Sequence, residues 1–246
     1  MEIYEFSKMG AFHTDHNEDA LAIVEIDTNT FLLAVMDGCS MGKESHFAST
    51  LIAKLLRKIG KEVSYDAFST TFNRSPSEYL DKVLKELFEE LKHLKNTLFL
   101  ETAELLSTLT LCVIDTEKRT ASVIVVGDGL VCCNGKLYNF DQNNRPNYLG
   151  YHLRGSFDAW SKQETQRLEL ENIHDLSLST DGILSFQNHD GKSYETITNE
   201  QIIHRILIDK TIKSKGNALK KSISEIEEQF GVQPGDDLTV IRFLIS

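Results

Sequence analysis

The chain has 246 residues, with 26 Lys and Arg against 37 Asp and Glu, which gives a formal net charge of −11 at pH 7. This acidic balance argues against a general binder of nucleic acid or of anionic membranes, because such proteins gather Lys and Arg on one surface. Hydrophobic residues make up 41% of the chain, and a chain of this length can bury a large core.

The first half of the chain predicts two strands followed by two helices. Strands are expected over 20–27 and 30–36, and the second is an apolar run of the kind that is buried on both faces of a sheet. Helical periodicity predicts helices over 43–60 and 76–94, the latter with Pro76 near its start. We expect the apolar stripes of both helices to face the core.

The second half is rich in strands and closes with two further helices. Strand signals cover residues 109–115, 121–126, 130–133, 136–139, 176–178 and 238–245. Asn134-Gly135 is a strong hairpin signal between the third and fourth of these. Helices are predicted over 200–208 and 217–230. Strand groups separated by helix pairs favour an α+β layered sandwich over alternating βαβ units, and without an internal repeat or linker we expect residues 1–246 to form one domain.

Targeting signals and cysteines suggest the setting. The N-terminus lacks a basic segment followed by an apolar one, and no run approaches the roughly 18 apolar residues of a spanning helix. The four cysteines form no C-x-x-C pair and are expected to be reduced, and the scattered histidines do not predict zinc. We therefore expect a cytoplasmic protein without a membrane or nucleic-acid partner, and its oligomeric state stays open.

Acidic residues recur where predicted strands end. Asp-Gly follows an apolar strand three times, at Asp37, Asp128 and Asp181, while Asp236-Asp237 precedes the last strand and Glu18 precedes the first. Strand ends of a rigid sheet can present side chains to one site, and carboxylates are the ligands that Mg²⁺ and Mn²⁺ prefer. A single Asp-Gly is most often a turn, as we expect for Asp190-Gly191. The pattern alone leaves turns and a metal site as competing interpretations.

Seven short motifs occur in one order along nearly the whole chain. They are Asn17-Glu18-Asp19, 31–38 (FLLAVMDG) with Gly42, 107–110 (STLT), 125–129 (VVGDG), 147–150 (NYLG) with 153–155 (LRG), 176–182 (LSLSTDG) and 236–240 (DDLTV). In this order the sequence resembles the metal-dependent Ser/Thr protein phosphatases of the protein phosphatase 2C (PPM) family, most closely the compact bacterial type. The resemblance implies a four-layer αββα sandwich, with two antiparallel β-sheets flanked by helix pairs.

The resemblance also implies a chemistry and a set of site residues. It implies hydrolysis of phosphoserine and phosphothreonine in proteins by a water activated between two Mn²⁺ or Mg²⁺ ions. Asp37 would bridge the two ions, and the catalytic set would be Asp37, Asp181 and Asp236. The Gly38 carbonyl and Glu18, the latter through water, would serve the first ion, and Asp181 and Asp236 would hold the second. Asp128, with Asp181, matches the position that binds a third ion.

The chain departs from the family near its phosphate-binding position. Four residues before Glu18 the family has an Arg that binds the substrate phosphate, and this chain has Thr14, which cannot form bidentate charge-assisted bonds. Positive charge has four other candidate sources, each of which also reads as a plain surface residue: His13, His16, Lys43 and Arg154. The second hypothesis is therefore a catalytically weak or inactive relative that binds phosphoproteins or other partners.

Three further features are left with two interpretations each. Cys39 directly follows the Asp37-Gly38 pair, where a free thiol suggests redox regulation and a packed small residue is the alternative. Asp237 stands where the family usually has Asn. Residues 139–163 are expected to include loops over the site, with four aromatic residues as surface contacts or as anchors to the core. These are Tyr148, Tyr151, Phe157 and Trp160.

Overall fold

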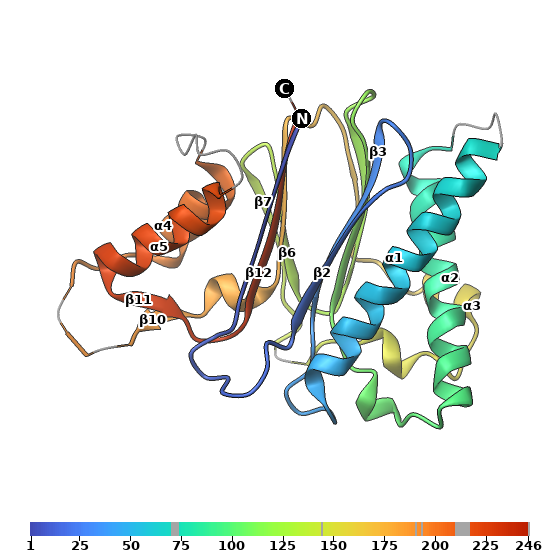
Figure 1. Ribbon diagram of the computed structural model, residues 1–246, viewed down its shortest axis with the longest axis horizontal. Coiled ribbons are helices and arrows are strands. Elements are labelled where there is room, and N and C mark those ends of the chain that lie inside the picture. The colour runs from blue at the N-terminus through green and yellow to red at the C-terminus, as the bar shows by residue number, and fades with distance from the viewer. Residues whose placement is uncertain (70–73, 144, 190, 193, 210–216, 246) are drawn as a thin grey trace.

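The computed structural model of the chain describes residues 1–69, 74–143, 145–189, 191–192, 194–209 and 217–245. Two five-stranded antiparallel sheets pack face to face, and helices cover both outer faces (Figure 1). The predicted α+β sandwich of four layers is confirmed. Among the described residues its core has three large parts, one between the two sheets and one beneath each helix layer, and a small fourth cluster around Cys39.

The first sheet has the strand order β2-β3-β4-β5-β8. Its strands are β2 (Asp19–Glu25), β3 (Thr30–Asp37), β4 (Leu109–Asp115), β5 (Thr120–Val126) and β8 (Arg167–Leu170). Helices α1 (Ser45–Ser69) and α2 (Pro76–Thr97) cover its outer face, as Figure 1 shows. The central strands are buried nearly throughout, because helices pack on one face and the second sheet on the other.

The second sheet has the order β1-β12-β9-β6-β7. Its strands are β1 (Glu2–Lys8), β12 (Leu238–Leu244), β9 (Asp175–Ser179), β6 (Gly129–Cys133) and β7 (Lys136–Phe140). The outer layer consists of α4 (Asn199–Ile203), the π-helical turn η4 (His204–Ile208), α5 (Ala218–Phe230) and a small hairpin of β10 (Phe186–Asn188) and β11 (Val232–Pro234). Strands β1 and β12 pair along their whole length, from Glu2 opposite Leu244 to Lys8 opposite Leu238.

Local sequence signals explain where the helices begin and how far they run. Helix α2 starts with Pro76 in its first turn, as the sequence indicated, and the structure adds a capping box between Ser75 and Glu78. Helix α1 starts at Ser45 and continues past Gly60, where the prediction ended it, because Val63 and Ala67 extend its apolar stripe onto the core. Helix α5 ends at Gly231 in the left-handed conformation, the usual helix stop.

Several elements differ from the prediction. Strands β1, β8, β10 and β11 and the short helix α3 (Phe157–Ser161) were not predicted, and the helix predicted over 200–208 is α4 followed by the π-helical turn. Asp190 of the predicted Asp190-Gly191 turn lies outside the described residues. All four cysteines are buried and form no disulfide. In the part of the chain that the structure describes, no helix is both long enough and apolar enough to cross a bilayer.

Candidate metal centre

The register of the first sheet brings three aspartates to one end of the sandwich, two of them, Asp37 and Asp128, predicted from the sequence. Asp37 is the last residue of β3, and Asp19, the first residue of β2, lies directly opposite it. Strand β4 begins at the same end, and its Leu109 pairs with Val126 at the end of β5. The turn that follows β5 carries Asp128, so this residue also lies at the end of the sheet that Asp37 occupies.

The second sheet delivers two further aspartates to the same place. Ser179 at the end of β9 pairs with Val240 near the start of β12, so the segments after β9 and before β12 are neighbours. Asp181 opens the 3-10 turn η3 (Asp181–Leu184) in the first segment, and Asp236 lies in the second. The Thr180 hydroxyl donates to Asp19 Oδ2 at 2.8 Å and joins the two sheets at this point.

Electrostatic repulsion shows that these carboxylates form one cluster. Burial, followed by repulsion from Asp19, Asp181, Asp236 and Glu18, raises the pKa of Asp37 well above its ordinary value. Burial, with repulsion from Asp236 and then Asp128, raises the pKa of Asp181 to about 6. The pKa of Asp236 is also raised, mainly by burial. A cluster of this kind disfavours its own ionisation and favours any cation that enters it.

Glu18 and Gly38 meet at the first turn of α1. The Ser45 hydroxyl donates to Glu18 Oε1, and the Ser40 hydroxyl donates to Oε2 at 2.8 Å, so both carboxylate oxygens are held in place. The Gly38 amide donates to the Glu18 carbonyl oxygen at 3.1 Å. A Cβ atom on Gly38 would lie 2.1 Å from the Ser45 carbonyl oxygen, which explains why the residue after Asp37 is glycine.

Asp128 lies beside Asp181, at the margin of the cluster. Burial raises the pKa of Asp128, and the nearby Asp141 raises it further. The Gln142 amide donates to Asp128 Oδ1 at 2.6 Å and fixes the carboxylate. Asp37 is not among the groups that shift the pKa of Asp128, whereas Asp128 does shift that of Asp181. This position fits a peripheral role.

Sequence reasoning did not assign Asp19 a role of its own. Its carboxylate is buried, and its Oδ1 atom has no hydrogen-bond partner among the described residues. Burial, followed by repulsion from Asp237 and Asp181 against two hydroxyl hydrogen bonds, raises its pKa well above the ordinary value. The Asn17-Glu18-Asp19 motif contained the signal, but only the pairing of Asp19 with Asp37 across β2 and β3 reveals it.

Asp237 connects the cluster to the neighbouring backbone, a structural role that sequence reasoning did not assign to it. Its side chain is fully buried and accepts backbone hydrogen bonds from Gly10 at 2.7 Å and Glu18 at 2.5 Å. His13 Nδ1 lies 2.8 Å from Asp237 Oδ2, and its Nε2 lies 3.5 Å from Asp236 Oδ1. A Cβ atom on Gly182 would lie 1.9 Å from the Asp237 carbonyl oxygen. The residue after Asp181 therefore has to be glycine, because the segments that carry Gly182 and Asp237 approach each other so closely.

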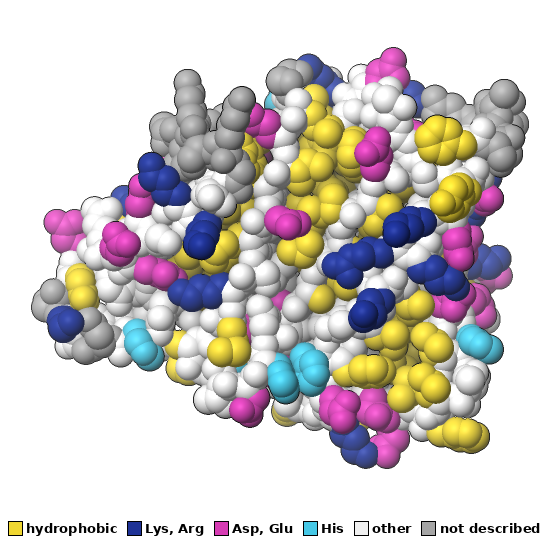
Figure 2. Space-filling model, viewed as in Figure 1, with side chains coloured by type: hydrophobic (Ala, Val, Ile, Leu, Met, Phe, Trp, Pro, Cys, Tyr) yellow, Lys and Arg dark blue, Asp and Glu magenta, His cyan; other side chains and the backbone are white. Residues whose placement is uncertain are grey.

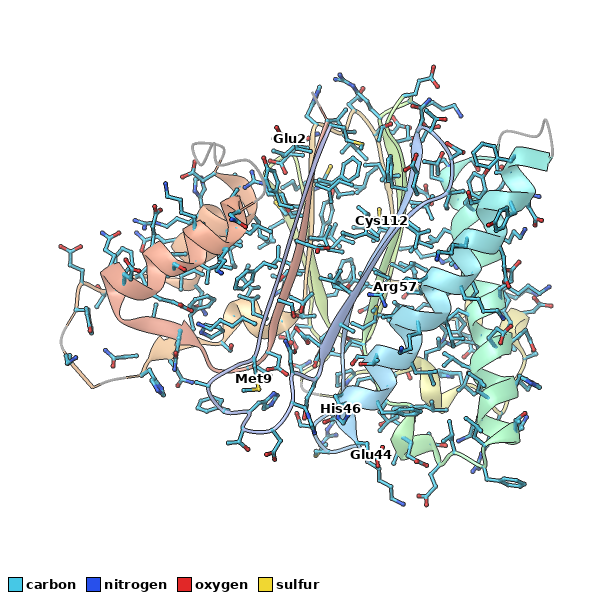
Figure 3. The ribbon with its side chains drawn as sticks, viewed as in Figure 1. Glu2, Met9, Glu44, His46, Arg57 and Cys112 are labelled. Atoms are coloured by element: carbon cyan, nitrogen blue, oxygen red, sulfur yellow. The ribbon has the colours of Figure 1, made fainter. Side chains whose placement is uncertain are left out.

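Thr14 lies in a pocket of about 590 Å³ beside the cluster, lined among others by His13, Glu18, Ser45 and His46. Figure 3 labels two of its lining residues at the lower end of α1: His46, in the first turn of the helix, and Glu44, which directly precedes the helix. The cyan histidine side chains at this end are visible in Figure 2. The pocket therefore opens on the end of the sandwich that carries the acidic cluster.

The four candidate cations have different surroundings. His13 contacts the cluster directly, and His16 lies in the Thr14 pocket with its ring 4.2 Å from that of His46. Lys43 is exposed and pairs with Glu101 at 2.6 Å. Arg154 lines a separate pocket at the end of α2. Only the two histidines are therefore next to Thr14.

The loop aromatics are mostly anchors. Tyr148 is buried with Cys39 and Leu106, and Phe157 and Trp160 pack against Phe88 of α2. Tyr151 alone of the four is exposed, at 51%. Cys39 is a buried residue in a small apolar cluster, which favours the interpretation of a packed side chain.

The donor set suits a hard divalent cation. Carboxylate oxygens from five acidic residues and a nearby glycine carbonyl are oxygen donors of the type that Mg²⁺ and Mn²⁺ select, and the unpartnered Asp19 oxygen would be satisfied by such an ion or its waters. Among the described residues, no three His, Cys, Asp or Glu side chains converge closely enough to form a ready-made cage. An acidic cluster that binds hydrated ions fits this spacing better than a dehydrated cage does.

Comparisons with known proteins agree with this architecture. The family model for protein phosphatase 2C matches residues 12–214. A solved bacterial serine phosphatase has 16% identity and a TM-score of 0.62, over 100% of this chain and 98% of that one. Serine/threonine phosphatase Stp1 from Staphylococcus aureus has 15% identity and a TM-score of 0.64, over 100% and 95%. PppA, a key regulatory component of T6SS in Pseudomonas aeruginosa, has 18% identity and a TM-score of 0.61, over 98% and 96%. No curated protein sequence matches the chain.

Proposed function

The chain belongs to the protein phosphatase 2C family, and on this premise we propose that it is a metal-dependent phosphoprotein phosphatase acting on phosphoserine and phosphothreonine. The observation that carries the proposal is the convergence of carboxylates from both sheets at one end of the sandwich. Such a site attracts divalent cations, and the adjoining Thr14 pocket opens on the same end.

The proposed roles of the residues follow from their positions. Asp37 lies between the carboxylates of both sheets and would bridge two Mn²⁺ or Mg²⁺ ions. Glu18 and the Gly38 carbonyl would serve the first ion, Glu18 through water because two hydroxyls already bind its carboxylate. Asp181 and Asp236 would hold the second ion. Asp128, with Asp181, would hold a third.

When bound, such ions lower the pKa of a shared water and neutralise the phosphate oxygens. The chain itself orients the ligands: Thr180 holds Asp19, Ser40 and Ser45 hold Glu18, and Gln142 holds Asp128. Water is the attacking group in this proposal, so no Cys or His serves as a covalent nucleophile. His13 Nε2 faces Asp236 and Glu18 and would hold these carboxylates in position.

The test is hydrolysis of p-nitrophenyl phosphate and of a phosphothreonine peptide in Mn²⁺, in Mg²⁺ and in excess EDTA. Wild type is expected to turn over only with metal. Asp37→Ala should abolish turnover, because neither ion is then properly held. Asp128→Asn should impair turnover less, because its carboxylate lies at the margin of the cluster.

Two results would contradict the proposal. Turnover of Asp37→Ala near that of wild type would exclude the two-metal assignment, and equal losses in the Asp37 and Asp128 variants would exclude a peripheral third ion. Absence of turnover with Mn²⁺ still bound by calorimetry would favour the second hypothesis, an inactive relative that binds phosphoproteins. The observation behind that alternative is Thr14 at the phosphate-binding position.

A further inference from the structure

A second pocket, at the C-terminal end of α2, has a positively charged lining, although the chain as a whole is negatively charged. It measures about 580 Å³, and its lining includes Lys92, Lys95, Arg154, Asn96 and Phe99, with no carboxylate. The neighbouring pocket between α1 and α2 is lined by five acidic residues. In a chain of net charge −11, three cations without an acid in one pocket mark a place where an anion is favoured.

The two lysines are held in place without being neutralised. Lys92 Nζ donates to the Gly155 carbonyl oxygen at 2.7 Å, and Lys95 Nζ donates to the Leu100 carbonyl oxygen at 2.9 Å and to the Thr102 hydroxyl oxygen at 3.2 Å. An ammonium group has three N–H donors, so Lys92 keeps two of them and Lys95 keeps one for a ligand. Burial, followed by repulsion from Arg154, lowers the pKa of Lys95. Glu104 and Glu101 act in the opposite direction but only in part, and Glu101 forms its ion pair with Lys43 at 2.6 Å rather than with Lys95.

Arg154 supplies the geometry for an oxyanion. Its side chain is exposed and makes no hydrogen bond or ion pair with any described residue. A guanidinium group presents its donors as a planar fork that matches carboxylate and phosphoryl oxygens. An unpaired fork beside two anchored ammonium groups forms a prearranged oxyanion site.

The rim of the pocket adds an apolar surface. Phe99 has a φ of 56°, in the left-handed region that bulky residues rarely adopt, and its side chain is 91% exposed. The adjacent Leu98 is 56% exposed. Apolar side chains next to cations suit a polypeptide that carries an acidic residue beside an apolar one.

The pocket and the metal centre lie at the same end of the molecule. Residues 100–106 line the pocket at Leu100 and then pass under the end of β3, where the Cys39 amide donates to the Leu106 carbonyl oxygen at 3.0 Å. Figure 1 shows the lower end of α2 on the side of the molecule where β2 begins. One extended chain can therefore be expected to reach both places.

We propose that the pocket of Lys92, Lys95 and Arg154 binds a carboxylate or a second phosphoryl group of a polypeptide whose phosphorylated residue lies in the metal centre. The identity of the ligand, a phosphorylated polypeptide, rests on the proposed function. The affinity of the pocket for an oxyanion does not. Free inorganic phosphate offers the same chemistry, so the experiment has to separate the two sources.

The binding arm uses the metal-free protein in EDTA, which removes the metal centre as a phosphate site. Calorimetry compares inorganic phosphate, an aspartate-rich peptide and the matched asparagine peptide. Arg154→Glu should weaken binding of the aspartate peptide about tenfold, the loss expected for one charge-assisted contact. Lys54→Glu makes the same charge change on the exposed face of α1 and should leave binding unchanged.

The kinetic arm uses the metal-loaded protein and two phosphothreonine peptides, one with flanking aspartates and one with flanking asparagines. The ratio of their kcat/KM values should favour the aspartate peptide in wild type and in Lys54→Glu. It should fall about tenfold in Arg154→Glu. Arg154→Gln, which removes the charge without reversing it, should give an intermediate ratio.

Each outcome decides a separate question. An unchanged ratio together with unchanged binding of the aspartate peptide in Arg154→Glu would overturn the inference. Loss of inorganic phosphate binding alone would overturn the polypeptide as its source. Absence of turnover in wild type, with aspartate-peptide binding that depends on Arg154, would contradict the proposed function and support the pocket.

Discussion

At the scale of single residues, His13 and Thr14 lie side by side in the pocket next to the acidic cluster and differ in what they could offer a phosphate. Thr14 offers a hydroxyl without charge. Burial lowers the pKa of His13, but contact with Asp237 and attraction by Glu18 and Asp236 outweigh it, so its pKa is raised. His13 is therefore committed to the carboxylates around it and does not replace the fork of an arginine. Position 14 therefore offers a phosphate no guanidinium group.

Thr14→Arg should lower the KM for p-nitrophenyl phosphate about tenfold with kcat little changed, because a bidentate charge-assisted contact contributes about 1.5–3 kcal/mol. Steady-state kinetics in Mn²⁺ measures this. Thr14→Lys is the matched control, since it adds the same charge without the fork and should give a smaller gain. An unchanged KM in Thr14→Arg would show that another group already binds the phosphate.

At the scale of elements, Arg242 links β12 to the π-helical turn. Its Nη2 lies 2.8 Å from Asp175 Oδ2 on β9, and its guanidinium also donates to the carbonyl oxygens of Ile206, Ile208 and Asp209. Both charged side chains are nearly fully buried. One arginine thus satisfies a buried carboxylate and also the carbonyls at the end of η4, which have no further turn of helix to bond.

Arg242→Met should lower the free energy of unfolding by about 3–5 kcal/mol, because it leaves the Asp175 carboxylate buried without its cation. Urea unfolding measures the loss. In the double variant Arg242→Met/Asp175→Asn, the buried charge is removed as well, so its loss should be smaller than the sum of the two single losses. Additive losses would show that the pair is not coupled.

The elements that the sequence predicted are those with a strong local pattern. Strands β3, β4 and β5 read as apolar runs, and Ser75, Pro76 and Glu78 define the start of α2. Strand β1 was missed because it is an edge strand with a single buried residue, Tyr4, and it pairs with the far end of the chain. Nothing in residues 200–208 indicates a π-helical turn, which is stabilised from outside by Arg242.

The candidate metal centre likewise contains residues with a local sequence signal and residues without one. The aspartates at 37, 128 and 181 follow strands and could be identified by their Asp-Gly pairs. Asp19 could not be recognised, because its role depends on the strand opposite. Contacts between sheets, such as that of His13 with Asp237, are set by tertiary packing and leave no local signal.

At the scale of the whole molecule, the acidic end lowers stability when no cation is present. Asp181 has an ordinary pKa of 3.8 and a folded pKa of about 6. Between these two pH values the folded state therefore binds more protons than the unfolded state. Protonation of Asp181 thus stabilises the fold: the effect is complete at low pH and is lost as the pH rises through 6. The contribution of Asp181 alone is about 3 kcal/mol.

In EDTA at pH 7.5, Asp181→Asn should raise the melting temperature by several degrees, at about 2–4 °C per kcal/mol for a chain of this size. At pH 4 the variant and wild type should melt together. Added Mn²⁺ at pH 7.5 should stabilise wild type more than the variant, because the variant lacks one of the proposed ligands. A variant that melts below wild type in EDTA at pH 7.5 would contradict the repulsion described here.

The pairing of β1 with β12 has a consequence for biosynthesis. The Ser7 and Thr239 hydroxyls, which bond across these strands, are 232 residues apart. At the roughly 5–20 residues per second of translation, β1 waits about 10 to 50 s on the ribosome for its partner. Asp236 emerges just before β12, so a nascent chain cannot complete the acidic cluster any earlier. A prematurely terminated chain would therefore leave β1 unpaired, as an edge open to aggregation, and could not assemble the acidic cluster.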